Sequence, residues 1–139
     1  MRWSDQVALV TGGSRGIGRA TALLLARRGC AVCVNHMVHA ESAEAVVSDI
    51  KADGGRAIAF LADIGDEKAV SSMIERVTTD FGPVTILINN AGNSQSATLD
   101  TYDQQQFERM RRVNVDGMKL AQRCRARRFM PPQRLRLSS

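Results

Sequence analysis

Short apolar runs alternate with longer amphipathic stretches along the chain. Four runs end at polar or glycine-rich positions, which is typical of strands buried on both faces of a parallel sheet: Val7–Val10, 31–35, 57–61 and Ile86–Ile88. The stretches between them repeat apolar residues every three or four positions. This spacing predicts helices from about Ile17, over Ala40–Ala52, over Glu67–Phe81 and, after a polar loop at 98–106, over 104–124. Strand and helix alternate four times, so we expect an α/β fold with helices on both faces of a parallel sheet.

A glycine-rich turn joins the first strand to the first helix. Gly12, Gly16 and Gly18 lack side chains where the backbone must turn tightly and where a ligand can come close. The free N–H groups and the positive dipole end of the helix would face whatever lies over these glycines, which suits a pyrophosphate. A plain strand-to-helix turn is the alternative interpretation. With this strand before it and this helix after it, the motif favours dinucleotide binding and a Rossmann-type, doubly wound sheet that is truncated after about four strands.

The other unusual polar segments also follow strands. Asn35 and His36 follow the second strand, Asp63 follows the third, and the segment 89–92 follows the fourth. In parallel sheets ligands bind beyond the carboxyl ends of the strands. These segments are therefore expected to meet at one site.

The charge divides the chain into two parts. All 14 acidic residues lie at or before Asp116, and six of the 19 basic residues lie in 123–139, so residues 1–122 carry a net charge of −1 and the tail carries +6. We therefore predict a nucleotide-binding domain over 1–122 and a basic, mobile or divergent tail over 123–139. An RNA- or phosphate-binding arm is the alternative for the tail, but few aromatic residues interleave its arginines, and we expect no nucleic-acid partner.

No apolar run of about 18 residues occurs, so we expect no membrane span, and no signal-like run precedes the first strand. Cys30 and Cys33 form a Cys-x-x-Cys pair on a predicted strand, where positions three apart face opposite sides. A redox pair belongs at a helix N-terminus, so we expect both thiols in the core and no metal site. Free thiols fit a cytoplasmic protein.

Three motifs, in this order and spacing, resemble the short-chain dehydrogenase/reductase family: Thr11-Gly12-x-x-x-Gly16-x-Gly18, Asp63 after the third strand, and Asn89-Asn90-Ala91-Gly92 after the fourth. The resemblance extends from residue 5 to about residue 124 and is strongest to 3-oxoacyl-carrier-protein reductases and sugar dehydrogenases. It implies hydride transfer between a nicotinamide cofactor and a small carbonyl or alcohol substrate, and helices that build a homo-oligomer.

The resemblance also implies roles for individual residues. The cofactor's phosphates and adenosine ribose would lie against Gly12, Ser14, Arg15, Gly16, Ile17 and Gly18, its adenine against Asp63 and Ile64, and its adenosine and ribose side against Asn90, Ala91 and Gly92. Asn89 would tie the fourth strand to its neighbours. Asn114 matches the helix asparagine that holds a water of the proton relay. Turn asparagines and a polar helix position are the alternatives.

The charge after the second strand predicts NADP(H) in preference to NAD(H). An NAD site places an acid there to bind the ribose 2′-hydroxyl. Here the run from Asn35 and His36 contains no acid before Glu41, and Arg15 can pair with a 2′-phosphate. His36 would add a donor, or else is simply solvated.

The chain departs from the family at its chemistry. The family motif Tyr-x-x-x-Lys is absent: Tyr102 is the single tyrosine, and position 106 is Gln. Ser139 falls near the place of the family's catalytic serine, but little of the expected context surrounds it. Three hypotheses follow: the front part of a reductase or dehydrogenase, a non-catalytic nucleotide-binding fragment or pseudoenzyme, and an interaction protein that works through its basic tail.

Overall fold

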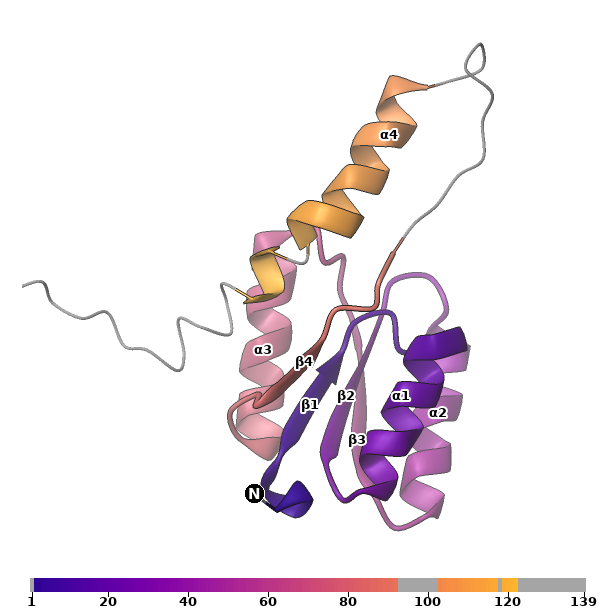
Figure 1. Ribbon diagram of the computed structural model, residues 1–139, viewed down its shortest axis with the longest axis vertical. Coiled ribbons are helices and arrows are strands. Elements are labelled where there is room, and N and C mark those ends of the chain that lie inside the picture. Colours follow the sequence, from indigo (N-terminus) through magenta and orange to yellow (C-terminus); the bar gives the residue numbers. More distant parts are fainter. Residues whose placement is uncertain (1, 93–102, 118, 123–139) are drawn as a thin grey trace, which may run out of the picture.

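The computed structural model describes residues 2–92, 103–117 and 119–122, and its centre is a four-stranded parallel sheet (Figure 1). The strands lie in the order β3-β2-β1-β4. Their bounds are β1 (Val7–Val10), β2 (Ala31–His36), β3 (Arg56–Leu61) and β4 (Ile86–Ile88), and a short 3-10 turn, η1 (Trp3–Asp5), precedes them. The parallel α/β sheet predicted from the hydrophobic pattern is confirmed.

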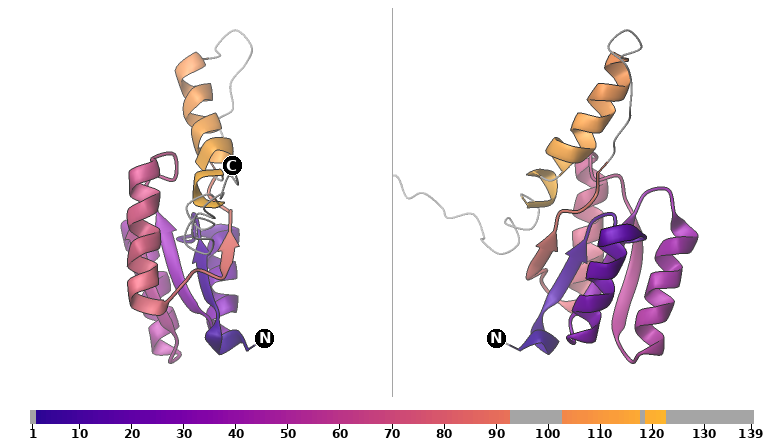
Figure 2. Two further views of the ribbon diagram at one scale, coloured as in Figure 1. Left: turned by 90° about the vertical axis from the view of Figure 1, so that its left-hand side faces the viewer. Right: turned by 45° about the vertical axis from the view of Figure 1, so that its right-hand side comes forward.

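Helices cover both faces of the sheet. The helices α1 (Gly16–Arg27) and α2 (Ala40–Ala52) lie on one face, and α3 (Glu67–Phe81) lies on the other (Figures 1 and 2). Alternate residues of β1 serve the two cores: Ala8 and Val10 pack with α1 and α2, while Val7 and Leu9 pack with α3. The strand is therefore apolar throughout because both of its faces are buried.

The sequence sets the bounds of α3 through local signals. The Asp66 carboxylate accepts hydrogen bonds from the backbone N–H groups of Lys68 (2.9 Å) and Ala69 (3.4 Å), which caps the helix. Gly82 ends it with a φ of 100°. Between these ends, one stripe of apolar side chains is buried: Val70, Met73, Ile74 and Val77. Each such burial contributes about 1.5–3 kcal/mol, so the stripe fixes which face of α3 meets the sheet.

The two neighbouring cysteines lie in different cores. Cys30 packs among the residues beneath α1 and α2, whereas Cys33 packs beneath α3. Burial raises the pKa of both thiols, that of Cys33 to about 12. The prediction that both thiols lie in the core is confirmed.

The helix predicted over 104–124 is present in the described residues 104–117 and 119–122, but it is not regular throughout. The helix α4 (Gln104–Arg111) begins where expected, capped by the Asp103 carboxylate, but it passes into a π-helical turn, η2 (Arg112–Asp116). There the Gly117 N–H bonds to the Arg112 carbonyl, five residues back, which inserts an extra residue into the turn. A repeat of three or four residues cannot indicate this insertion.

The strand order creates a switch point between β1 and β4. The chain moves outward from β1 to β3 and then returns to the other side of β1 to form β4. All four strands run the same way, so their carboxyl ends share one end of the sheet (Figure 1). Among the described residues, β4 pairs with β1 alone, and no helix there is both long and apolar enough to span a membrane.

Candidate cofactor site

A cavity of about 510 Å³ lies beyond the carboxyl ends of the strands. Its wall combines the turn after β1, the end of β2, the loops after β3 and β4, and Val113 of η2. The sequence predicts thirteen cofactor-binding residues, and all of them except Ile17 and Gly18 line this cavity. Sequence reasoning missed five lining residues, none of which belongs to a recognisable motif: Met37, Val38, His39, Ala62 and Val113.

The turn after β1 offers backbone donors beside open space. Gly12 and Gly16 adopt left-handed conformations, with φ of 63° and 58°. A Cβ placed on Gly16 would meet no atom within 4 Å. Arg15 is the N-cap of α1 and makes no side-chain hydrogen bond to the first turn. The first N–H groups of α1 are therefore left without a side-chain cap, an arrangement that suits an anion.

Gly12 and Gly18 face protein atoms where Gly16 faces open space, and a Cβ on Gly12 would lie 2.9 Å from the Ala91 Cα. Gly18 is buried, and a Cβ there would overlap the Gly12 carbonyl oxygen and the Asn90 side-chain nitrogen. The missing side chain of Gly18 thus lets α1 pack directly on the turn, and a contact of Gly18 with a ligand stays a prediction. Ile17 lies on the outside of α1, 79% exposed.

Asn35 supports the glycine turn from β2. Its Oδ1 accepts a hydrogen bond from the Gly12 N–H (3.2 Å), and its Nδ2 donates to the Ala62 carbonyl (3.1 Å). The Asn35 carbonyl also accepts from the Gly13 N–H (3.0 Å). Although Asn35 lines the cavity, its side-chain amide is thus already engaged with the protein.

The loop after β4 is tied to the same turn. The Thr11 hydroxyl donates to the Ile88 carbonyl (3.2 Å) and accepts from the N–H groups of Asn90 and Ala91 (3.0 Å each). The Asn90 Nδ2 donates to the Gly12 carbonyl (3.0 Å), whereas Asn89 is exposed. Asn90 therefore makes the connection that the sequence assigned to Asn89. Thr11 is the positioning residue that sequence reasoning missed, and its signal is a hydroxyl at the end of a wholly apolar strand.

Asp63 and Ile64 form the wall after β3. One Asp63 carboxylate oxygen accepts from the Gly65 N–H (2.8 Å), and the other lies 3.5 Å from an Arg112 guanidinium nitrogen of η2. Ile64 is buried in the core beneath α3. The Asp63 carboxylate is thus held in place, but it is also shared with an arginine that no sequence motif singled out.

The two predicted catalytic residues are placed differently. Asn114 lies in η2, and its Oδ1 is 3.4 Å from where a Cβ on Gly92 would stand, so it reaches the loop after β4. A π-helical turn is frequently found at functional positions. Ser139 lies outside the described residues, as does Tyr102.

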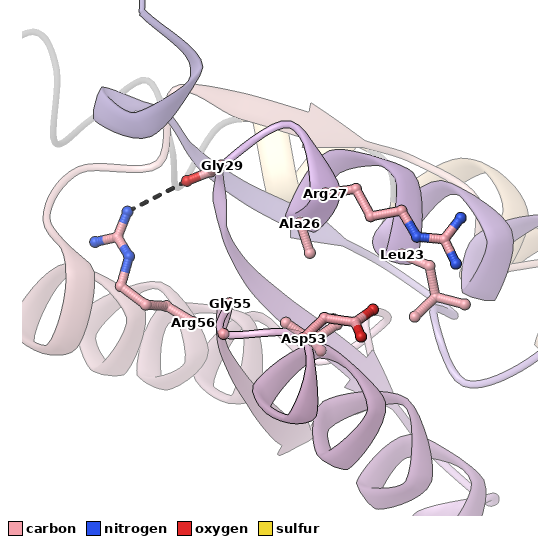
Figure 3. Close-up of a pocket in the computed structure, with 9 residues that line it drawn as sticks. Leu23, Ala26, Arg27, Gly29, Asp53, Gly55 and Arg56 are labelled. Carbon is pink, nitrogen blue, oxygen red and sulfur yellow. Dashed lines mark hydrogen bonds between the residues drawn. The ribbon is translucent and has the colours of Figure 1, made fainter.

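A second cavity, of about 430 Å³, lies at the opposite end of the sheet (Figure 3). It lies between the carboxyl ends of α1 and α2, where Arg27 and Asp53 stand. Arg56 spans its edge and donates to the carbonyls of Ser4 (3.1 Å) and Gly29 (3.5 Å). Helix carboxyl ends carry negative partial charge and disfavour phosphates, in contrast to the N-terminus of α1 at the first cavity. In the described part of the chain, no three His, Cys, Asp or Glu side chains cluster as metal ligands.

Comparisons with known proteins agree with this geometry. A family model described as short chain dehydrogenase matches residues 6–134. Versicolorin reductase 1 of Aspergillus parasiticus is 42% identical over 116 residues, which are 84% of this chain and 44% of that protein. A 3-oxoacyl-[acyl-carrier-protein] reductase of Staphylococcus aureus is 42% identical over 111 residues, which are 80% of this chain and 45% of that protein.

Solved structures show the same likeness. A short chain dehydrogenase from Burkholderia cenocepacia, solved in complex with NADP, superposes with a TM-score of 0.87 at 42% identity. The match covers 91% of this chain and 52% of that one. This chain therefore spans about half the length of the relatives it matches.

Proposed function

The chain belongs to the short-chain dehydrogenase family, and from that premise we propose that it forms the NADP(H)-binding part of an oxidoreductase. This enzyme would transfer hydride between the cofactor and a small carbonyl or alcohol substrate. The observation that carries the proposal is the uncapped N-terminus of α1 beside Gly16, where the cavity is open and a side chain would have met nothing. Helix N-termini of this kind hold pyrophosphates in dinucleotide-binding folds.

The residues present fit a bound dinucleotide. The pyrophosphate would rest over Gly16 and the first N–H groups of α1, with Arg15 beside it. The adenosine would extend towards His36 on one wall and towards Asp63 and Ile64 on the other. The nicotinamide would supply the hydride chemistry, and the residues of this chain would bind and orient it, while Asn114 would hold the water of the proton relay.

The charge on the cavity wall supports NADP(H) rather than NAD(H). Among the described lining residues Asp63 is the only acid, and its carboxylate already faces Gly65 and Arg112. Arg15 lines the same cavity and is exposed. A guanidinium binds a phosphate through charge-assisted hydrogen bonds, so a 2′-phosphate gains a partner here and meets little repulsion.

Calorimetric titration of the full chain with NADP⁺ and NAD⁺ tests this proposal. We expect NADP⁺ to bind at least tenfold more tightly, and we expect Arg15→Ala to remove most of that difference by weakening NADP⁺ alone. Arg19→Ala is the matched control, since Arg19 lies on the same helix outside the cavity and pairs with Asp49 at 3.4 Å. Equal or tighter binding of NAD⁺ by the unaltered chain would overturn the cofactor assignment.

A non-catalytic nucleotide-binding fragment or pseudoenzyme is the second candidate. It is favoured by the sequence itself, which has one tyrosine, Tyr102, and no Tyr-x-x-x-Lys motif. Carbonyl reduction needs a proton as well as a hydride, and that motif supplies the proton in the family. We therefore expect this chain to bind NADPH without oxidising it in the presence of ketones. Turnover above a blank would contradict this expectation, and a Tyr-x-x-x-Lys encoded beyond Ser139, in any reading frame, would favour the enzyme.

A further inference from the structure

Arg112 reaches the wall of the cofactor cavity from outside. It is the first residue of η2 and is not one of the residues that line the cavity. One of its guanidinium nitrogens lies 3.5 Å from an Asp63 carboxylate oxygen, while the other oxygen of that carboxylate accepts from the Gly65 N–H (2.8 Å). Each oxygen of the Asp63 carboxylate therefore has a partner of positive charge or partial charge within the protein.

Two glycines allow η2 to dock on the loop after β3. A Cβ on Gly65 would lie 2.7 Å from the Arg112 Cγ and 2.9 Å from its Nε, so the arginine stem lies directly over this glycine. Gly117 follows η2, and a Cβ there would lie 2.7 Å from the Ile64 Cγ1. These close contacts fix η2 against the loop that supplies Asp63 and Ile64 to the cavity wall. The guanidinium is thereby directed at the Asp63 carboxylate.

The negative charge of Asp63 is the property of this wall that Arg112 changes. Among the described lining residues Asp63 is the only acid, and its side chain is 25% exposed. A dinucleotide is itself an anion, so an unpaired carboxylate in the same cavity would oppose its binding. The neighbouring guanidinium offsets this repulsion and also restricts the orientation of the carboxylate. Because the Arg112 side chain is 52% exposed, solvent screens the pair and its effect amounts to a few-fold in affinity.

We propose that Arg112 is a positioning residue of the nucleotide site, which holds and neutralises the Asp63 carboxylate from outside the cavity so that this wall accepts an anionic dinucleotide. The inference rests on the proposed function, which places the adenosine beside Asp63. Arg112 differs from Arg15, which lines the cavity and would meet a phosphate directly. Arg112 acts through Asp63, so its effect on nucleotide affinity requires the charge of that carboxylate.

Two substitutions separate the charge of Arg112 from its packing. Arg112→Lys and Arg112→Met both keep an unbranched stem over Gly65, but lysine alone keeps the charge. In calorimetric titrations of the full chain, the Lys variant should bind NADP⁺ and NAD⁺ within about twofold of the unaltered protein, and the Met variant about fivefold more weakly. Arg111→Met is the matched control, because Arg111 is the adjacent residue, is similarly exposed and pairs with Asp116 at 3.9 Å instead. Its affinity for both nucleotides should stay within about twofold.

The same titrations on a chain that carries Asp63→Asn test whether Arg112 acts through Asp63. Asparagine keeps an acceptor oxygen for the Gly65 N–H and removes the charge. In this background Arg112→Met should change the affinity for either nucleotide by less than about twofold. The proposal is overturned by an equal loss in both backgrounds, by a loss in Arg112→Lys as large as that in Arg112→Met, or by unchanged affinity in Arg112→Met. Failure of the unaltered chain to bind either nucleotide would instead overturn the proposed function.

Discussion

Replacement of Gly16 by alanine separates the two things that this glycine provides, a left-handed backbone and an open cavity floor. Gly16 has a φ of 58°, and a Cβ there would meet no protein atom within 4 Å. A methyl group therefore clashes with nothing in the free protein, and only the backbone is strained. In the complex the same methyl group would occupy space that we assign to the pyrophosphate.

Gly54 is the matched control for the strain. It has a φ of 82°, and a Cβ there would also meet nothing within 4 Å, but it lies at the far end of the sheet. A left-handed alanine costs about 1–2 kcal/mol, and the stiffer unfolded chain returns about 0.4–1 kcal/mol. Both variants should thus lose roughly 0.5–1.5 kcal/mol of unfolding free energy, which corresponds to a fall in Tm of roughly 2–6 °C.

The two variants should differ in binding. We expect Gly16→Ala to weaken NADP⁺ at least tenfold, or about 1.4 kcal/mol, and Gly54→Ala to bind within twofold of the unaltered chain. Thermal unfolding without ligand measures the strain, and calorimetric titration measures the affinity. If Gly16→Ala binds NADP⁺ normally, or if both variants lose affinity equally, the pyrophosphate does not lie over the N-terminus of α1.

Three further substitutions test the packing around the site and the core. Gly18→Ala should lower the free energy of unfolding in urea by about 1–3 kcal/mol, as overpacking does, because its methyl group would overlap the Gly12 carbonyl oxygen. A loss no larger than that of Gly54→Ala would contradict the packing role of Gly18. Asn35→Ala should lower the free energy of unfolding by about 2–3 kcal/mol in the same assay, because it leaves the Gly12 N–H and the Ala62 carbonyl unpaired. An unchanged free energy of unfolding would show that these two hydrogen bonds do not stabilise the glycine turn. Burial raises the pKa of the Cys33 thiol in the folded protein from 9.0 to about 12. Between these values the native state keeps a proton that the unfolded chain loses. The contribution of the buried thiol to the free energy of unfolding is therefore complete below about pH 9 and declines as the pH rises towards 12. Urea unfolding at pH 8, 9 and 10 should show a fall of up to about 1.4 kcal/mol per pH unit that Cys33→Ala lacks, and parallel curves would exclude the effect.

Much of the fold could be predicted because its signals are local. The bounds of α3 follow from apolar spacing together with Asp66 and Gly82 at its ends, and those of α2 from apolar spacing and the stop at Asp53; the structure reproduces both ranges. The cavity wall was also predictable, because parallel strands bring their carboxyl ends together whatever lies between them. The sequence could not predict which of the residues in the cavity wall support the fold and which face the open space. The packing role of Gly18 depends on how closely the loop after β4 approaches the glycine turn. The hydrogen bond from the Gly12 N–H to Asn35 depends in the same way on how closely the end of β2 approaches that turn.

The strand order explains how a chain of half the length of its relatives can contain every segment that lines the proposed cofactor site. The crevice at the switch point needs β1 on one side and β4 on the other, and the described residues contain both, together with the loops that follow β2 and β3. Each of those loops gives a side chain or a backbone group to the same cavity. The proton-transfer motif of the family is a different matter, since Tyr-x-x-x-Lys does not occur in these 139 residues. Under our proposal, cofactor binding and proton transfer therefore depend on separate stretches of sequence in this fold, and the calorimetric titration tests the first of them by itself.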